Sequence, residues 1–277
     1  MDLNTIEAVL RPAGRGDLAG GRDGGRDGDA WLAGGTWLFS EPQPDLRRLV
    51  DLGALGWEPL RPSEAGLEIA ATCTLARLAR LEPPADWAAA PLIPGCCRAL
   101  VGSFKVWNAA TVGGNLCLAL PAGPMAALAC ALDADCLIWT PDGGERRLPA
   151  RDFVLGPRRT ALGPGEVLRR IDVPAAALRR RAALRRIALS PEGRSGALLA
   201  GTRGPEGFAL TVTAAVRRPV HLAFAAMPGP EALRAALAET IAAADWYDDV
   251  HGAPDWRAHV TGLLAEEIRA ELAEGGA

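Results

Sequence analysis

Apolar and polar residues alternate along this chain in short blocks, which predicts strands interleaved with helices. Brief β-branched or apolar runs bounded by glycine, proline and aspartate are typical of strands. We predict such strands over residues 31–32, 46–52, 66–72, 136–139, 146–148, 167–173, 208–216 and 219–225. Helices are predicted over residues 74–80 and 124–133, and from about residue 255 to the C-terminal end. The fold class we expect is α+β.

Two of the predicted helices have recognisable ends. Thr74 is placed to cap the first, and the pair Pro83-Pro84 follows it, a sequence that cannot continue a helix. In the last helix, apolar residues recur at helical spacing, with Asp255 before them and Gly275 after them. These apolar residues are Trp256, Val260, Leu263, Leu264, Ile268 and Leu272.

With 277 residues, the chain is long enough for two domains that share a ligand cleft. Alanine and arginine become more frequent after Pro174, and we place a domain boundary there. The first domain is then residues 1–176, with subdomains of about 1–55 and 56–176. The second, residues 177–277, contains strands and helices and is expected to serve packing and assembly.

Composition narrows the function classes. The net charge of −3 argues against nucleic acid as the main partner. No apolar run reaches the roughly 20 residues of a membrane span, and the N-terminal residues lack the features of a signal peptide. The six cysteines show no C-x-x-C spacing, so we interpret them as buried free thiols of a cytoplasmic protein.

Two Gly-Gly pairs stand out as candidate anion-binding segments. Gly34-Gly35 and Gly113-Gly114 each have a threonine beside them, Thr36 and Thr111. Adjacent glycines allow φ > 0 and can turn several N–H groups toward one phosphate. Two such segments could enclose a diphosphate, which suggests a dinucleotide ligand. Taken alone, each pair is weak evidence, because most Gly-Gly pairs are only tight turns.

The surrounding motifs resemble the FAD-binding subunit of the molybdenum hydroxylases, the medium subunit of the carbon monoxide dehydrogenase and xanthine dehydrogenase type. The resemblance covers about the first two thirds of the chain. It is carried by Ala33-Gly34-Gly35-Thr36, Asn108-Ala109-Ala110-Thr111-Val112-Gly113-Gly114-Asn115, Ala131-Leu132-Asp133-Ala134, and the segments 151–160, 165–168 and 171–174.

This resemblance implies a two-subdomain FAD-binding domain of the molybdopterin dehydrogenase type, followed by a C-terminal flavoprotein domain. It also implies a set of FAD-contacting residues. Leu155 would lie near the isoalloxazine ring, although it could equally be a core leucine, and Arg185 would stabilise the reduced flavin. The remaining expected contacts are Ala33, Gly34, Gly35, Thr36, Trp37, Ala110, Thr111, Gly113, Gly114 and Asn115.

The chain departs from the family at two places. Many relatives have Ser-Asp near the position of Gly123-Pro124, with the carboxylate bound to the ribityl chain, and this chain has neither residue. The tract over residues 14–29 is rich in glycine, arginine and aspartate where relatives have a helix. Its Gly14-x-Gly16 resembles a Rossmann fingerprint only superficially, because no strand precedes it.

Other candidate chemistry is sparse. His221, His251 and His259 are too scattered for a metal site, and the chain contains none of the common hydrolase or nucleotide-binding motifs. Tyr247, the single tyrosine, could stack on a partner or cap the last helix. We expect no catalytic residue for substrate chemistry and no metal ligand in this chain.

These observations lead to two hypotheses. The first, which the resemblance implies, is an electron-transfer oxidoreductase subunit carrying FAD. It would take electrons from the [2Fe–2S] small subunit of a complex whose molybdopterin-containing large subunit oxidises substrate, and pass them to NAD⁺, oxygen or a quinone. The second is an assembly scaffold or weak flavin binder that keeps the fold. A stand-alone flavin reductase would need an NAD(P)H site, for which we find no second fingerprint.

Overall fold

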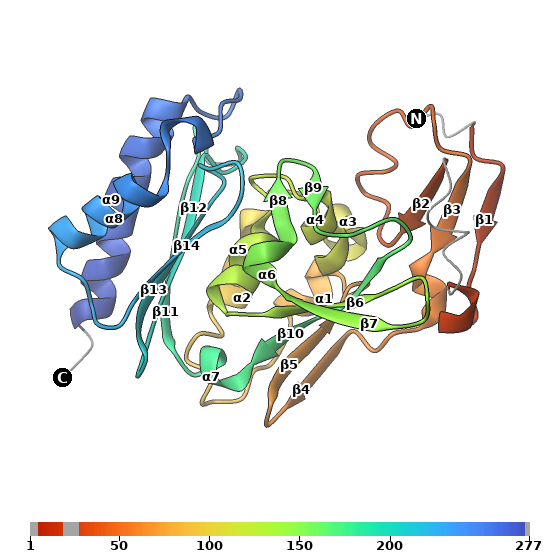
Figure 1. Cartoon of the computed structure of the whole chain (residues 1–277), viewed down its shortest axis with the longest axis horizontal. Helices are drawn as coiled ribbons and strands as arrows, with labels where there is room; N and C mark the ends of the chain where they lie inside the picture. The colour runs from red at the N-terminus through yellow and green to blue at the C-terminus, as the bar shows by residue number, and fades with distance from the viewer. Residues whose placement is uncertain (1–4, 19–27, 275–277) are drawn as a thin grey trace.

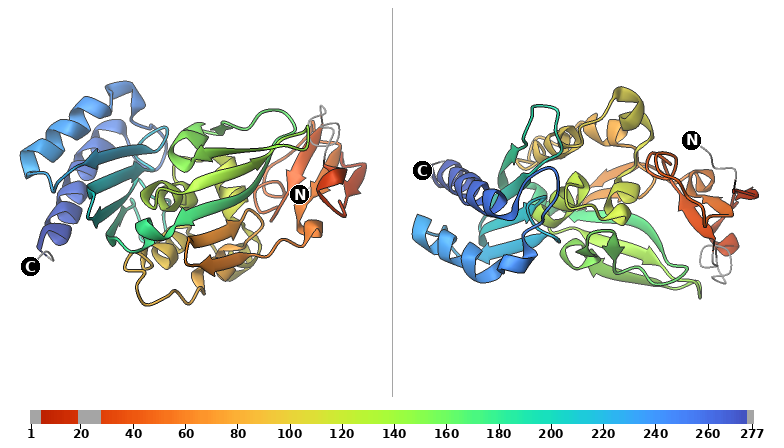
Figure 2. Two further views of the ribbon diagram at one scale, coloured as in Figure 1. Left: turned by 60° about the horizontal axis from the view of Figure 1, so that its bottom comes forward. Right: turned by 90° about the horizontal axis from the view of Figure 1, so that it is seen from above.

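The computed structural model describes residues 5–18 and 28–274, and in it the three larger sheets lie side by side along the longest axis (Figure 1). The N-terminal sheet lies at one end and the C-terminal sheet with its helices at the other (Figure 2). A five-stranded sheet with most of the short helices occupies the centre. This arrangement confirms the α+β class.

The N-terminal sheet is parallel, with the order β1-β3-β2. Its elements are β1 (Ala8–Leu10), η1 (Arg15–Asp17), β2 (Asp29–Leu32), β3 (Arg48–Asp51) and η2 (Leu52–Leu55). The predicted strands at 31–32 and 46–52 are both present. Residues 19–27 of the glycine-rich tract lie outside the described residues. A small core that includes Val50, Leu52 and Val167 joins this sheet to the central one.

The central sheet is antiparallel, with the order β4-β5-β10-β6-β7. Its strands are β4 (Leu60–Ser63), β5 (Gly66–Ala70), β6 (Asp135–Trp139), β7 (Glu145–Pro149) and β10 (Val167–Pro174). A two-stranded hairpin is made by β8 (Val154–Gly156) and β9 (Arg159–Thr160). The strands predicted at 66–72, 136–139, 146–148 and 167–173 are confirmed.

The helices of the central part are short. They are α1 (Leu75–Ala79), α2 (Leu92–Ala99), α3 (Phe104–Ala109), α4 (Val112–Leu118), α5 (Pro124–Ala131), α6 (Ala150–Phe153) and α7 (Ala175–Leu178). Thr74 caps α1 as predicted, its hydroxyl accepting the N–H of Arg77 at 3.2 Å. All eight residues of α5 are buried. Helices α2, α3 and α4 are missing from the sequence-based prediction. Pro94 and Gly95 lie inside α2, and Gly113 and Gly114 lie inside α4, and both residue types are poor helix formers.

The C-terminal sheet has four antiparallel strands, where the sequence predicted two. These are β11 (Arg181–Ile187), β12 (Ala197–Gly204), β13 (Gly207–Thr213) and β14 (Val220–Phe224), in sequence order. One face packs on α5 through residues such as Leu198 and Ala200. The other is covered by α8 (Pro230–Thr240) and α9 (Pro254–Glu274), with η3 (Ala243–Asp245) between them (Figure 1).

The last helix is present but differs in detail from the prediction. It begins at Pro254, and the carboxylate of Asp255 accepts the N–H of Trp256 at 2.7 Å. Leu263, expected on the apolar face, is 55% exposed, while Leu264 and Ala265 are buried. At 100° per residue, Leu263 falls outside the arc of the helix that holds Val260, Leu264 and Ile268. Gly275 lies outside the described residues.

Candidate functional site

The first glycine segment, residues 33–37, leaves the end of β2 and packs directly against the end of α3. A Cβ added to Gly34 would lie 1.8 Å from the carbonyl oxygen of Ala109, and Gly35 has φ +69°. Both glycines are therefore required by backbone geometry. The first segment meets the second at this contact, as the two-segment hypothesis expects.

The first segment also has unpaired backbone hydrogen-bond donors. Within the described part of the chain, the N–H groups of Gly34, Gly35 and Thr36 donate to no acceptor. Gly35 is buried and its neighbours are half-buried. Backbone N–H groups that are shielded from solvent and unpaired favour a ligand with acceptor oxygens. This segment can hold a phosphate.

The second glycine pair differs from its prediction. Gly113 and Gly114 lie in the first turn of α4, and neither has a positive φ. The N–H of Gly113 donates to Ala71 O at 2.9 Å, and that of Gly114 to Thr111 Oγ1 at 3.0 Å. The N–H of Asn115 donates to Thr111 O. The expectation of a positive φ at these glycines is wrong, because both lie in the first turn of α4, while their role at a phosphate stays a prediction.

Close packing explains the glycine at position 113. An added Cβ would lie 2.4 Å from Ala71 Cβ and 2.7 Å from the Ala71 backbone, so α4 approaches β5 more closely than any side chain allows. The exposed Gly114 would meet only Thr111 Oγ1, at 2.8 Å. Asn115 Oδ1 accepts the N–H of Met125 at 3.1 Å, which leaves its amide nitrogen available to a ligand.

A third segment, the turn between β8 and β9, completes the site. Arg158 has φ +57°, and its N–H donates to Ala119 O at 3.0 Å, at the end of α4. Its guanidinium lies 5.6 Å from the ring centroid of Trp37, in the first segment. Leu155, on the same hairpin, is 45% exposed, so it is not a core leucine. Its position beside a flavin ring stays a prediction.

Arg185 is not part of this group. It lies on β11, where its guanidinium hydrogen bonds Glu267 at 2.9 Å and Glu271 at 2.5 Å, both on α9. That face of the C-terminal sheet points away from the glycine segments, because the neighbouring Leu184 faces the central core instead. The resemblance implied a position for Arg185 near the flavin, and strand alternation instead turns its side chain toward α9.

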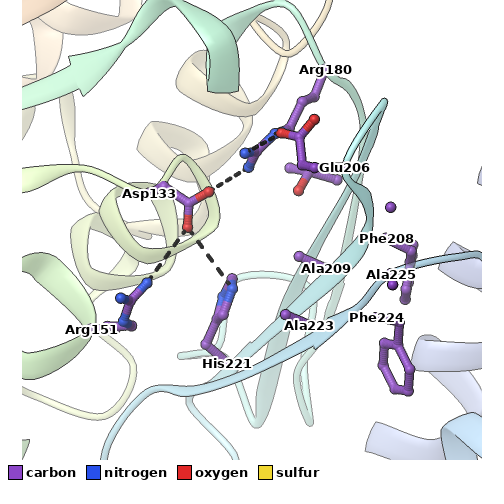
Figure 3. A pocket seen from close by; sticks show the side chains of 12 residues that line it. Asp133, Arg151, Arg180, Glu206, Phe208, Ala209, His221, Ala223, Phe224 and Ala225 are labelled. Atoms are coloured by element: carbon purple, nitrogen blue, oxygen red, sulfur yellow. Dashed lines mark hydrogen bonds and ion pairs between the residues drawn. The ribbon is translucent and has the colours of Figure 1, made fainter.

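A pocket lies elsewhere, between the central part and the C-terminal sheet (Figure 3). Its volume is about 530 Å³, and Asp133 projects into it between Arg151, Arg180 and His221. Arg180 pairs with Asp133 at 2.5 Å, while Asp133 Oδ1 lies 3.9 Å from His221 Nε2. Burial lowers the pKa of His221. This pocket contains none of the expected FAD-contacting residues, although Asp133 and Arg151 belong to the motifs that carry the family resemblance.

The cysteines and Tyr247, which the sequence also singled out, contact other parts of the chain. Five cysteines are buried and Cys117 is half-buried, all as free thiols, as predicted. Burial raises the pKa of Cys73 to about 12. The ring of Tyr247 lies beside two arginines, with its centroid 6.0 Å from the guanidinium of Arg217 and 5.7 Å from that of Arg257.

In the described ranges, no group of three or more His, Cys, Asp or Glu residues could hold a metal ion. Nor does any helix there have the length and apolarity to span a membrane.

Solved structures share this fold over nearly the whole chain. The reconstituted CO dehydrogenase from Oligotropha carboxidovorans matches with a TM-score of 0.80 at 22% identity, over 98% of this chain and 99% of that chain. Quinoline 2-oxidoreductase from Pseudomonas putida 86 matches with a TM-score of 0.78 at 21% identity, over 99% of both chains. At these identities the likeness shows the fold.

Similarity in sequence points to the same group of proteins. Xanthine dehydrogenase 1 of Arabidopsis thaliana is 31% identical over 127 residues, which are 42% of this chain and 9% of that enzyme. The glyceraldehyde dehydrogenase medium chain of Sulfolobus acidocaldarius is 36% identical over 74 residues, which are 27% of this chain and 26% of that one. The chain thus spans about a tenth of the plant enzyme's length.

A family model settles the membership. The family described as "FAD binding domain in molybdopterin dehydrogenase" matches residues 18–176, more than half of the chain, and its match includes all three segments of the site. The unpaired N–H groups at Gly34–Thr36 suit the diphosphate of that cofactor. This chain belongs to the family of FAD-binding domains of molybdopterin dehydrogenases, a family of oxidoreductases.

Proposed function

We propose that this chain is the electron-transfer subunit of a heteromeric molybdenum hydroxylase. It would receive electrons from a partner subunit with [2Fe–2S] clusters, while a molybdopterin-containing large subunit oxidises the substrate. The acceptor would be NAD⁺, oxygen or a quinone, and the complex would be cytoplasmic. The domain division at residue 176 and the assembly role of residues 177–277 belong to this proposal.

One observation supports this proposal most strongly. The N–H groups of Gly34, Gly35 and Thr36 are unpaired at the place where Gly34 contacts Ala109, just before the cap of α4. Thr111, Asn115, Trp37 and the exposed Leu155 would line the rest of the cofactor site, with Ala33 and Ala110 as close backbone neighbours. Gly113 would contribute by letting α4 approach Ala71 closely, and Gly114 lies in the exposed first turn of α4 beside Thr111.

Bound FAD would supply the redox chemistry, since a flavin exchanges electrons with both one-electron and two-electron partners. The chain's own residues would bind the dinucleotide, fix its orientation and leave its ring accessible beside Leu155, which is 45% exposed. The absence of Ser-Asp near Gly123-Pro124 removes one contact that many relatives make. We therefore expect weaker FAD retention than with that contact present, by about 1 kcal/mol.

The test is electron transfer between purified components. The FAD-loaded chain is mixed without oxygen with its candidate iron–sulfur partner, reduced beforehand, and the flavin absorbance near 450 nm is followed. Bleaching that depends on the partner is expected. A chain that forms the complex yet keeps its flavin oxidised, while dithionite reduces that flavin readily, would contradict the electron-transfer role and favour the scaffold hypothesis.

A further inference from the structure

The glycine segments offer a diphosphate only neutral donors, and the structure places a cation beside the first of them. The N–H groups of Gly34, Gly35 and Thr36, and that of Thr111, donate to no acceptor in the described part of the chain. A dinucleotide diphosphate has two negative charges, which neutral donors do not neutralise. We infer that Arg158 binds the FAD diphosphate from the turn between β8 and β9. This inference rests on the proposed FAD site.

Arg158 has the position that this role requires. Its guanidinium lies 5.6 Å from the ring centroid of Trp37, one residue beyond the free N–H of Thr36. Its backbone is fixed from the opposite side, where its N–H donates to Ala119 O at the end of α4. The turn therefore links the C-terminal end of α4 to the first glycine segment, and the Arg158 side chain lies beside Trp37 of that segment.

The guanidinium is also unoccupied by protein groups. Arg158 is exposed, and across the described residues its side chain forms no hydrogen bond or ion pair. The ring of Trp37 orients it through a cation–π contact without using its N–H donors. An arginine in that state can give two parallel hydrogen bonds to a phosphate.

Its backbone conformation is a second, independent observation. A φ of +57° costs a residue with a long side chain about 1 kcal/mol, whereas asparagine and glycine adopt it readily. An arginine at this position is therefore poorly suited to the turn itself. Strained residues that persist tend to lie at ligand sites, where the side chain has a role beyond folding.

Asparagine at position 158 separates the two effects. Arg158→Asn relieves the backbone strain and removes the charge, so the variant should unfold at the same or a higher urea concentration than the wild type. Its dissociation constant for FAD, measured by flavin fluorescence quenching on the apo-chain, should rise about ten-fold. Arg158→Lys should fall between the two. Arg159→Asn, the adjacent exposed arginine without a contact to Trp37, is the matched control and should bind like the wild type.

Riboflavin distinguishes a phosphate contact from a contact to the flavin ring. Because riboflavin lacks phosphate, Arg158→Asn should leave its dissociation constant within two-fold of the wild type. Equal loss for both ligands, or no loss for FAD, would overturn the role of Arg158 while leaving the FAD site intact. A wild-type chain that binds no FAD would instead overturn the proposed function and this inference together.

Discussion

Gly34 and Ala109 touch through their backbones, so that the two glycine-containing segments of the chain form one site. A methyl group on Gly34 would lie 1.8 Å from the Ala109 carbonyl oxygen and 2.7 Å from its carbon. No side-chain rotation can relieve an overlap between backbone atoms. The distance between the N-terminal and central sheets therefore depends on the absence of a Cβ at position 34.

Gly34→Ala should separate these segments. We expect FAD binding to be lost and the free energy of unfolding to fall by about 1–3 kcal/mol, as for overpacked sites, measured by urea denaturation and by flavin content. Gly262→Ala is the control, because an added Cβ in α9 meets no atom within 4 Å. That variant should gain about 0.5–1 kcal/mol of stability and keep its flavin. Normal flavin content in Gly34→Ala would contradict the contact.

Gly113 and Gly114 should respond differently to alanine. Gly113→Ala places its Cβ 2.4 Å from Ala71 Cβ, and we expect about 1–3 kcal/mol of destabilisation as α4 is forced from β5. Gly114→Ala meets only the hydroxyl oxygen of Thr111 at 2.8 Å, and an exposed helical glycine gains from a methyl group. Its free energy of unfolding, measured in urea, should stay within about 0.5 kcal/mol of the wild type. Equal effects would show that the packing at Ala71 is unimportant.

Arg257 should be the most sensitive charged residue in the C-terminal part. It is 1% exposed and donates to the carbonyl oxygens of Gly196, Ala214 and Gly252, and to Asp249. Arg257→Leu leaves these buried acceptors unpaired and should cost about 3–5 kcal/mol in chemical denaturation. The exposed pair Arg61–Glu68 provides the comparison. Arg61→Ala should cost less than about 1 kcal/mol. Comparable losses would argue against this network.

His221 should make stability fall in mild acid. Burial lowers its pKa below the unfolded value of about 6.5, and the positive charges of Arg151 and Arg180 lower it further, while Asp133 opposes them. The unfolded chain therefore binds the proton more readily, so the free energy of unfolding decreases as pH falls through 6.5. Urea denaturation at pH 7.5, 6.5 and 5.5 should show this slope. It should be shallower in His221→Asn, and an unchanged slope would assign it to another group.

The sequence was informative where local pattern and structure agree. Thr74, the run at 136–139 and the apolar content of 124–133 each predicted their element. It was less informative where an element depends on its neighbours. Strand β12 is an apolar run buried on both faces, and β11 contains three arginines, one of which, Arg185, pairs with carboxylates on α9. Neither pattern is distinctive before the helices on either side are known.

The site was predicted in the same uneven way. Motifs identified the residues around Gly34 and Thr111, but they did not show that Gly113 serves packing on Ala71. That role depends on a strand more than 40 positions earlier in the chain. Arg158 was part of the matching segment without an assigned role, and its positive φ and its contact with Trp37 emerge only in three dimensions.

The central claim is that this chain holds FAD, and the most direct measurement is a titration of the purified chain with FAD. After gel filtration, the visible spectrum and the flavin released on denaturation give the stoichiometry. The account predicts close to one FAD per chain, with absorbance that bleaches on reduction by dithionite, and loss of that flavin in Gly34→Ala. A folded wild-type chain that retains no FAD after incubation with an excess would contradict it.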